Sequence, residues 1–417
     1  MPHPVALSEP VEGWCASGGE DSLPAKVAGR AEKITVETIS NYQAFLDLEP
    51  VWRDVAEAAG CDHPFLEHAW VRTWWESFGA GSTLHILVLR AGKRPIAIAP
   101  LMLTPVRMYG VKVLRLGFLY NAHVPCADFL ISDRPDEVYR AIWTHLSHNR
   151  RWDVLQLCQL ADGGETLKEV PRLAAASGFR IGVWASDASP YVLLSSSWDA
   201  YFNSLAAKHR SNLRNRLKRL KAAGPVELAT IASADGLAEA LETGFRLEAA
   251  AWKGEEQTAI SCDPAVSEFY SALADRAAEQ GWIRIHFLQA GAARVAFDYS
   301  LFYKNKLHLL KVGYDPAYAP FSPSNLLLCL VLQKACEQGL TEYDFLGAEA
   351  GWKLNWARQV KRYSWLFVFP GTLKGRVLYF IKFQLVPLLK RSRHRDVRGF
   401  IQRVAAHCSN RGAQRGD

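Results

Sequence analysis

Changes in the spacing of apolar residues divide the chain into predicted elements. Apolar residues recur with helical spacing over residues 42–60 and 64–79, and each segment ends in glycine, which commonly stops a helix. The second of these segments has a strongly aromatic face. Residues 83–103 form two strand-like runs around a turn at 91–94, which predicts a hairpin. The other elements predicted for this half are strands at 33–39, 112–119, 128–132 and 153–160 and a helix at 136–149.

The second half of the chain repeats this order of elements. A long helix is predicted at 197–224, with Ser197 as its cap, and two further helices precede a hairpin at 283–303. The elements predicted after this hairpin are a strand at 306–314, a helix at 325–338, a short strand at YDFLG and a strand at 363–369.

Two hairpins, one in each half, also match in sequence. VLRAGKRPIAIA (88–99) aligns without gaps with FLQAGAARVAFD (287–298), and this pairs Leu89 with Leu288. Together with the repeated order of elements, the match predicts two tandem copies of one mixed α/β unit. We expect a leader at 1–32, domains at 33–195 and 196–370, and a basic tail at 371–417.

Composition limits the classes of partner. The chain has 417 residues, enough for two domains, and its 49% hydrophobic and 22% charged residues are typical of a globular protein. The formal net charge of +7 and the pI near 8.9 indicate an anionic partner, such as a nucleotide cofactor, an acidic lipid, an acidic polymer or a nucleic acid.

The cysteines and histidines do not indicate a metal site. No two of the eight cysteines form a CxxC pair, and His63, His68, His123 and His209 lack metal-ligand spacing. Scattered cysteines in a chain of this length are typical of reduced thiols. Because the first 30 residues lack an apolar core and no apolar run is long enough to span a membrane, we expect a cytoplasmic protein.

The segment 306–357 carries the strongest functional pattern. Its loop FSPSN stands at a predicted helix start, where unpaired backbone N–H groups and a partial positive charge favour a bound phosphate. The following strand places Asp344, Glu349 and Lys353 just beyond its carboxyl end, where open α/β sheets bind their ligands. This arrangement predicts a cofactor site beside a substrate site.

Several stretches resemble a known enzyme fold. The repeated order of helices, antiparallel hairpin, strand, helix and strand resembles the GNAT acyl-CoA N-acyltransferase fold, present here twice. PFLEHAWVRTWWESFG, KHRSNLRNRLKRL, EAAAWKG, GYDPAYAPFSPSNLLL and YDFLGAEAGWKLNWA look like the bacterial acetyltransferases of cellulose and exopolysaccharide biosynthesis, the CelD-like group, which are similar to the Fem aminoacyl ligases. The resemblance covers roughly residues 33 to 370. One departure is Ser324-Asn325, where the family usually has glycine, which allows close backbone approach to a phosphate.

The resemblance implies that an acyl-CoA donor binds to the second half. Its pyrophosphate would lie on loop 322–325, for which an ordinary helix cap is the structural alternative. Strand 308–316 would separate from its neighbour and offer backbone groups to the pantetheine arm and the thioester oxygen, or would be a plain core strand. The cofactor-binding candidates are Val312, Gly313, Ser322, Ser324 and Asn325.

Acyl transfer to an amine needs a group that removes the amine proton. Asp344 is one candidate, because a carboxylate among apolar strand residues is costly unless it is paired or functional. An ion pair between Asp344 and Lys353 is the structural alternative. Glu248, on an early helix that forms the acceptor wall in this fold, is the second candidate, and a solvated helix residue is its alternative. Tyr314 is placed to protonate the leaving thiolate, or is a buried structural tyrosine.

Basic and polar residues are candidates for binding the acceptor, and the aromatic helix of the first half is expected to shape the acceptor cleft. The predicted helix at 208–221 contains seven basic residues and no acid, with Leu213, Leu217 and Leu220 as its buried stripe. It is either a solvated face or a site for an anionic sugar phosphate, a lipid, the CoA phosphates or a tRNA arm. The substrate-binding candidates are Lys208, Arg210, Arg214, Trp252, Lys253, Glu349 and Lys353.

The segment 373–395 mixes long apolar residues with lysine and arginine, and it is too short and too interrupted to span a membrane. A basic amphipathic stretch can lie in the headgroup region of an anionic leaflet. The alternative is a helix that packs back on the second domain, kinked at Pro387. We expect a peripheral contact with the inner face of the membrane.

These features lead to one expected function and three alternatives. We expect an acyltransferase that moves an acyl group from acetyl-CoA or a longer acyl-CoA to an amine or hydroxyl of a sugar or lipid precursor in exopolysaccharide or cell-envelope biosynthesis. The acceptor would enter between the domains. A long-chain N-acyltransferase for a sphingoid-like amine, an aminoacyl-tRNA-dependent Fem-like ligase and a non-catalytic membrane-associated scaffold remain open. Nucleic-acid binding is expected only for the ligase.

Overall fold

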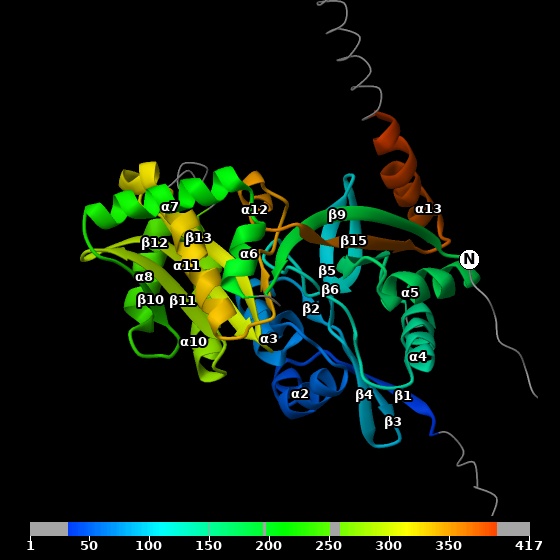
Figure 1. Cartoon of the computed structure of the whole chain (residues 1–417). Coiled ribbons are helices and arrows are strands. Elements are labelled where there is room, and N and C mark those ends of the chain that lie inside the picture. Colours follow the sequence, from blue (N-terminus) through cyan, green and yellow to red (C-terminus); the bar gives the residue numbers. More distant parts are fainter. Residues whose placement is uncertain (1–31, 149, 195–196, 251–258, 390–417) are drawn as a thin grey trace, which may run out of the picture. The chain divides into compact units, whose positions relative to one another are not determined.

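Strands and helices of the first half follow nearly the predicted order (Figure 1). The computed structural model describes residues 32–148, 150–194, 197–250 and 259–389. The strands of this half are β1 (Ile34–Ile39), β2 (Thr83–Leu84), β3 (Ile86–Ala91), β4 (Arg94–Ala99), β5 (Leu101–Met108), β6 (Val111–Phe118), β7 (Leu130–Ile131), β8 (Val154–Ala161) and β9 (Arg180–Leu193). Its helices are α1 (Tyr42–Leu46), α2 (Glu49–Ala58), η1 (Pro64–Leu66), α3 (His68–Phe78), α4 (Pro135–His148) and α5 (Glu165–Ala176).

The second half contains the larger helices. Its strands are β10 (Val226–Ile231), β11 (Ile283–Ala290), β12 (Ala293–Tyr303), β13 (Lys306–Tyr314), β14 (Glu342–Asp344) and β15 (Gln359–Phe369). Its helices are α6 (Trp198–Ser204), α7 (Ala207–Ala222), α8 (Leu237–Ala249), η2 (Ile260–Cys262), α10 (Pro264–Glu279), η3 (Pro316–Phe321), α11 (Pro323–Glu337), α12 (Gly351–Leu354), α13 (Leu373–Phe380) and η4 (Ile381–Leu385). Within the described ranges, no helix is long and apolar enough to cross a membrane.

The two hairpins of the predicted repeat have a shift in strand register at the same aligned position. The pairing of β3 with β4 shifts between Leu89 and Arg90, and that of β11 with β12 shifts between Leu288 and Gln289. The alignment without gaps equates these two positions, so each half carries a β-bulge at the same place. In both halves a first strand pairs antiparallel with the hairpin, and a later pair of strands runs parallel. The expected repeat of a mixed α/β unit is confirmed.

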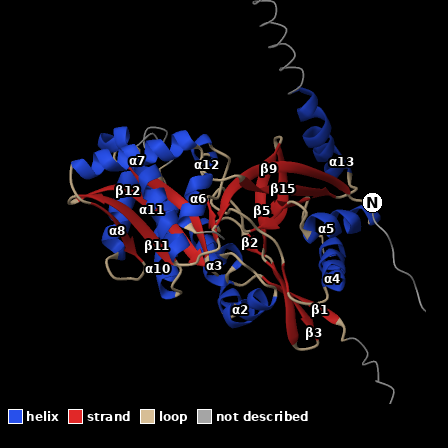
Figure 2. Ribbon diagram, in the orientation of Figure 1, coloured by secondary structure: helices blue, strands red, loops and turns tan. Residues whose placement is uncertain are grey.

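One large sheet joins the halves through exchanged strands. A four-stranded sheet has the order β1-β3-β4-β7, and an eleven-stranded sheet has the order β10-β11-β12-β13-β14-β9-β15-β8-β6-β5-β2. Thus β9 from the first half lies between β14 and β15 of the second half, and β15 lies between β8 and β9. Figure 2 shows β9 and β15 side by side. The division into two domains at 195/196 stays a prediction, because one sheet contains strands from both sides of this position.

Two of the predicted long helices are each divided in the structure. The segment 42–60 forms α1 and α2, because Pro50 in the first turn of α2 lacks the N–H group that would continue the hydrogen bonds of α1. The segment 197–224 forms α6 and α7, separated by Leu205 and Ala206, whose backbones are extended. The basic residues of α7 therefore belong to a separate, shorter helix.

The aromatic helix α3 packs against the second half. Trp70 meets Phe269 of α10 edge-on, with ring centroids 5.5 Å apart, and Phe78 lies 5.2 Å from the same ring. Arg276 of α10 donates to Thr73 at 2.7 Å. No residue of α3 lines the cavity described below, so the expectation that this helix shapes the cleft directly is wrong.

Candidate functional site

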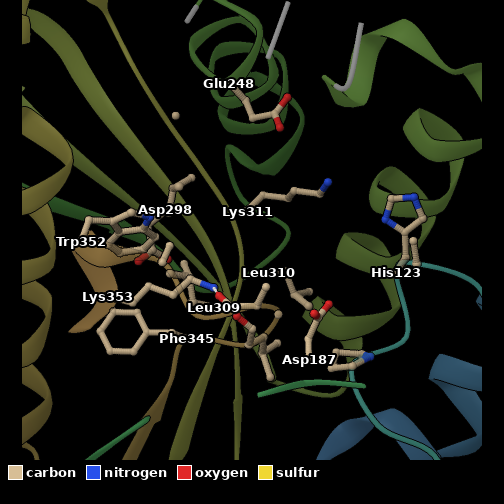
Figure 3. Close-up of a pocket in the computed structure, with 18 of the residues that line it drawn as sticks. His123, Asp187, Glu248, Asp298, Leu309, Leu310, Lys311, Phe345, Trp352 and Lys353 are labelled. Carbon is tan, nitrogen blue, oxygen red and sulfur yellow. Dashed lines mark hydrogen bonds between the residues drawn. The ribbon is translucent and has the colours of Figure 1, made fainter. Parts of the chain in front are cut away.

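A cavity opens where β13 and β14 separate. These strands pair in parallel only along Lys306–His308 and Glu342–Asp344, and β13 then continues to Tyr314 without β14 beside it. The space along this stretch is a cavity of about 680 Å³, lined by residues of both halves (Figure 3). The predicted separation of strand 308–316 from its neighbour is therefore present.

A bulge distorts β13 within the cavity wall. Its pairing with β12 shifts between Tyr299 and Ser300, and this leaves Leu310 as the extra residue. A bulge bends its strand and re-aims the side chains and peptide groups that follow. Val312 and Gly313, two of the predicted cofactor-binding residues, follow this bulge and line the cavity.

Gly313 allows helix α8 to approach the cavity. A Cβ at this position would lie 2.4 Å from both the Cα and the backbone nitrogen of Glu248. Gly244, one turn earlier in α8, likewise faces the ring of Phe297, which a Cβ there would meet at 2.1 Å. These two glycines let α8 pack directly on β12 and β13, and this contact brings Glu248 to the cavity.

The start of α11 forms part of the cavity wall. Ser322 precedes the helix in a left-handed conformation (φ 50°) and makes no side-chain cap hydrogen bond, so it is not an ordinary side-chain cap. Ser322 does not line the cavity, whereas Ser324 and Asn325 do. Asn325 Oδ1 accepts a hydrogen bond from Trp356 Nε1 at 3.1 Å, which ties the helix start to the segment after β14.

The segment after β14 bends over the cavity. Lys353 Nζ donates to the carbonyl oxygens of Leu346 and Ala348, the latter at 2.9 Å. Burial lowers the pKa of Lys353 to about 8. Trp352 and Lys353 line the cavity, but Glu349 is exposed and lies outside its lining.

Asp344 is buried away from the cavity. Its side chain is 2% exposed, accepts hydrogen bonds from Ser189 Oγ and the Leu346 N–H at 2.9 Å each, and forms an ion pair with Lys361 at 2.8 Å. The structure therefore gives Asp344 a structural ion pair, with Lys361 rather than the expected Lys353 as its partner. It does not bring Asp344 to a place where it could meet an amine.

Glu248 and Tyr314, the other two catalytic candidates, both line the cavity. Glu248 is fully buried, and its Oε2 accepts the Ile260 N–H at 2.9 Å. Its carboxylate is therefore held by backbone at the end of α8 while it faces the cavity (Figure 3). Tyr314 is half-buried at the end of β13.

His123 is a cavity residue that sequence reasoning did not select. It lies in the loop after β6, stacked on Phe78 with ring centroids 5.6 Å apart, and its Nδ1 is 3.2 Å from the Tyr270 hydroxyl. Burial lowers its pKa to about 4, so the imidazole is neutral at pH 7. An isolated histidine without metal-ligand spacing gave no local signal, because its neighbours come from distant parts of the chain.

A lysine completes the polar group in this part of the cavity. Lys311 lies between Glu248 and His123 (Figure 3), and its Nζ is 5.0 Å from the centre of the Tyr270 ring, within range of a cation–π contact. A carboxylate, an ammonium group and a neutral imidazole thus converge on one cavity. Such a set can accept a proton from a bound amine and balance the resulting charge.

The basic residues of α7 lie outside the cavity lining. Arg210 donates to the carbonyl oxygens of Asn203 and Leu205 at 2.5 and 2.6 Å, so it caps the end of α6. Arg214 lies over the Phe202 ring at 5.2 Å, and Lys208 is exposed. As predicted, the leucine stripe of this helix faces the core, with Leu213 and Leu220 buried and Leu217 partly buried.

Of the five substrate-binding candidates that the structure describes, only Lys353 lines the cavity. Trp252 and Lys253 lie outside the described residues. The groups of His, Cys, Asp and Glu in the described ranges include none that could hold a metal ion.

Comparison with known families matches the part of the chain that forms the second-half wall of the cavity. Residues 207–354 match the family described as an acetyltransferase (GNAT) domain. This segment includes α8, β13, the start of α11 and the segment after β14. No curated protein matches the chain.

Solved structures resemble this chain at low sequence identity. The crystal structure of FemX is 13% identical with a TM-score of 0.53, and the match covers 84% of this chain and 100% of FemX. The C-terminal domain of a lysylphosphatidylglycerol synthetase candidate from Agrobacterium fabrum is 11% identical (80% and 95% covered, TM-score 0.48). A tandem GNAT protein from the clavulanic acid biosynthesis pathway is 14% identical (80% and 98% covered, TM-score 0.42).

At 13% identity, the likeness to FemX shows a common fold and carries no information about a common substrate. The domain match covers the second half, and the first half repeats its hairpin register and its parallel strand pair. The chain therefore has a tandem GNAT-like, mixed α/β fold with an acetyltransferase-type domain in its second half.

Proposed function

We propose that this protein is an acyl-CoA-dependent N-acyltransferase whose acceptor is an amine on a sugar or lipid precursor of the cell envelope or an exopolysaccharide. The observation that carries the proposal is the cavity itself. It follows the stretch of β13 that has left β14, it lies largely within the segment that matches the acetyltransferase domain, and it holds groups suited to proton transfer.

The donor would bind at the second-half side of the cavity. Ser324 and Asn325 at the start of α11 and the ammonium group of Lys353 suit the anionic end of a CoA. The thioester end would lie along β13, next to the bulge at Leu310. Leu309 and Leu327 extend this wall with apolar side chains, which supports a long acyl chain as well as an acetyl group.

The chemical step needs one base and one acid. The amine nitrogen would attack the thioester carbonyl carbon, and its proton would pass to Glu248 or His123, which both line the cavity beside Lys311. The carbon–sulfur bond would then break, and the thiolate would take a proton from Tyr314. Asp344 has no part in this scheme, because its carboxylate is paired with Lys361.

The acceptor would enter from the side formed by the first half. This wall consists of the loop 120–125 with Ser186 and Asp187 of β9. The exposed Asp187 carboxylate suits an acceptor that arrives as a protonated amine. An amino sugar and a sphingoid-like amine both have this chemistry, and the apolar donor wall supports the second.

Calorimetry with acetyl-CoA and with a long-chain acyl-CoA tests the proposal. We expect saturable binding of at least one of them, weakened in Lys353→Gln and unchanged in Glu349→Gln, whose side chain lies outside the cavity lining. If neither thioester binds at millimolar concentration, the acyl-CoA donor is wrong.

An aminoacyl-tRNA-dependent ligase is the second candidate, and the basic face of α7 favours it. Lys208 and Arg214 are exposed on a helix without acidic residues, which suits a nucleic-acid backbone. Salt-sensitive binding of tRNA together with no binding of acyl-CoA would support this function. If Glu248→Gln and His123→Asn both leave the cellular product unchanged, a non-catalytic scaffold would replace both candidates.

A further inference from the structure

We infer that the outer face of α13 and its continuation to Leu389 binds an anionic lipid surface. This inference is independent of the acyl-transfer proposal, because no residue of α13 lines the cavity. It rests on a helix that is anchored on one side and apolar and basic on the other.

The inner face of α13 is fixed to the sheet. Leu378 is almost completely buried, and a Cβ at Gly375 would meet the Pro370 carbonyl oxygen at 2.2 Å. Farther along, the Phe383 ring covers Gly182 of β9, where a Cβ would lie 2.2 Å away. The strands beneath belong to both halves, so the predicted alternative of packing on the second domain alone is incomplete.

The outer face exposes large apolar side chains. Leu373 is 80% exposed, Phe380 56% and Leu388 58%. Val377 and Leu389 are also exposed. The spacing of residues 373, 377, 380 and 388 keeps them on one face of a helix. Figure 1 shows β9 and β15 on the inner side of α13, with no other described element along its outer side.

The charged residues of the segment that contains α13 are all basic. The sequence contains no aspartate or glutamate between Glu349 and Asp396. Arg376 is exposed. Lys382 does not add to this charge, because its Nζ lies over the rings of Trp184 of β9 and Phe367 of β15 at 4.2 and 4.1 Å, on the inner side. Beyond the described residues, the sequence continues as KRSRHR. Lys374 is not counted here, because it forms an ion pair with Asp153 at 2.7 Å.

An anionic membrane surface is the partner that matches both properties. Leucine and phenylalanine side chains enter the boundary between headgroups and acyl chains, while arginine and lysine contact the acidic headgroups. A second copy of this chain would meet the same basic charge, and like charges disfavour that occupant.

Sedimentation of the full chain with vesicles tests this inference. Vesicles of phosphatidylcholine mixed with phosphatidylglycerol are compared with vesicles of phosphatidylcholine alone, at low and high salt. We expect binding to the anionic vesicles that decreases with salt. The double variant Phe380→Ser/Leu388→Ser should lower the partition coefficient by roughly a hundredfold, because each buried apolar side chain contributes about tenfold.

The control variant is Leu193→Ser, which changes an exposed leucine (46%) at the end of β9 adjoining β14. It should bind vesicles like the unchanged protein, and all variants should keep the same melting temperature. Equal sedimentation with and without phosphatidylglycerol, or unchanged binding of the double variant, would overturn the inference. Light scattering that shows a dimer lost in the double variant, without vesicle binding, would assign the face to a second copy instead.

Discussion

At the scale of single residues, two buried carboxylates in the second half differ in what surrounds them. Asp344 meets a serine hydroxyl, a backbone N–H and Lys361, and these partners use both of its oxygens. Glu248 is equally buried but lines the cavity beside Lys311. A buried carboxylate in this half is therefore paired within the fold in one place and lines the cavity in the other.

Substitution of these carboxylates should separate the two roles. We predict that Glu248→Gln lowers kcat by roughly 100- to 10,000-fold, the range expected when a general base is lost. Asp344→Asn should instead lower the free energy of unfolding by about 1–3 kcal/mol, because Lys361 loses a buried partner but keeps Glu342. Steady-state kinetics and urea unfolding measure the two effects. A large loss of kcat in Asp344→Asn without a loss of stability would contradict this assignment.

At the proposed donor site, Lys353 should make binding depend on pH. Because burial lowers its pKa to about 8, the ammonium group loses its proton and its charge as the pH rises through 8. We predict that acyl-CoA binding weakens by about fivefold between pH 7 and pH 9, equivalent to roughly 1 kcal/mol for one lost charge contact. Calorimetry over this range should show a flat profile for Lys353→Gln. If the affinity of Lys353→Gln fell with pH as steeply as that of the unchanged protein, Lys353 would have no part in donor binding.

At the scale of elements, the close contact of β13 with α8 sets the position of Glu248. We predict that Gly313→Ala lowers the free energy of unfolding by about 1–3 kcal/mol and reduces activity, because the new Cβ would press on the backbone of Glu248. The matched control is Gly351→Ala, where nothing lies within 4 Å of the added Cβ and the change should stay within about 0.5 kcal/mol. Equal stability of the two variants would contradict the close packing.

Local patterns predicted most elements, and they also predicted the loop before α11, of which Ser324 and Asn325 line the cavity. The hairpins, β13 and α11 follow from apolar spacing and turn residues, whereas the break before Pro50 was missed, because the helical spacing of apolar residues continues across it. The exchange of β9 and β15 could not be predicted, because strand order depends on pairings between distant segments. The contact of His123 with Tyr270 could not be predicted either, because the two residues are 147 positions apart in the sequence. Likewise, the partner of Asp344 was predicted as the nearest lysine and is in fact Lys361.

At the scale of the whole molecule, the exchanged strands make each half depend on the other. Without β15, β8 and β9 lose the strand between them, and without β9, β14 loses its antiparallel neighbour. We predict that residues 34–195 and 197–389, expressed separately, aggregate or unfold without a cooperative transition, because their exposed strand edges are unpaired. Co-expression should yield a soluble pair. Size-exclusion chromatography and thermal unfolding measure this, and two monomeric halves with sharp transitions would show that the exchange is dispensable.

The cavity between the halves is the central feature of this protein, and a crystal structure of the full chain with a bound acyl-CoA tests its role most directly. We predict that the phosphates contact the start of α11 near Ser324 and Lys353, and that the thioester lies along β13 with its carbonyl carbon facing Glu248 and His123. A CoA bound elsewhere on the chain, with the cavity along β13 still empty, would contradict the proposed function.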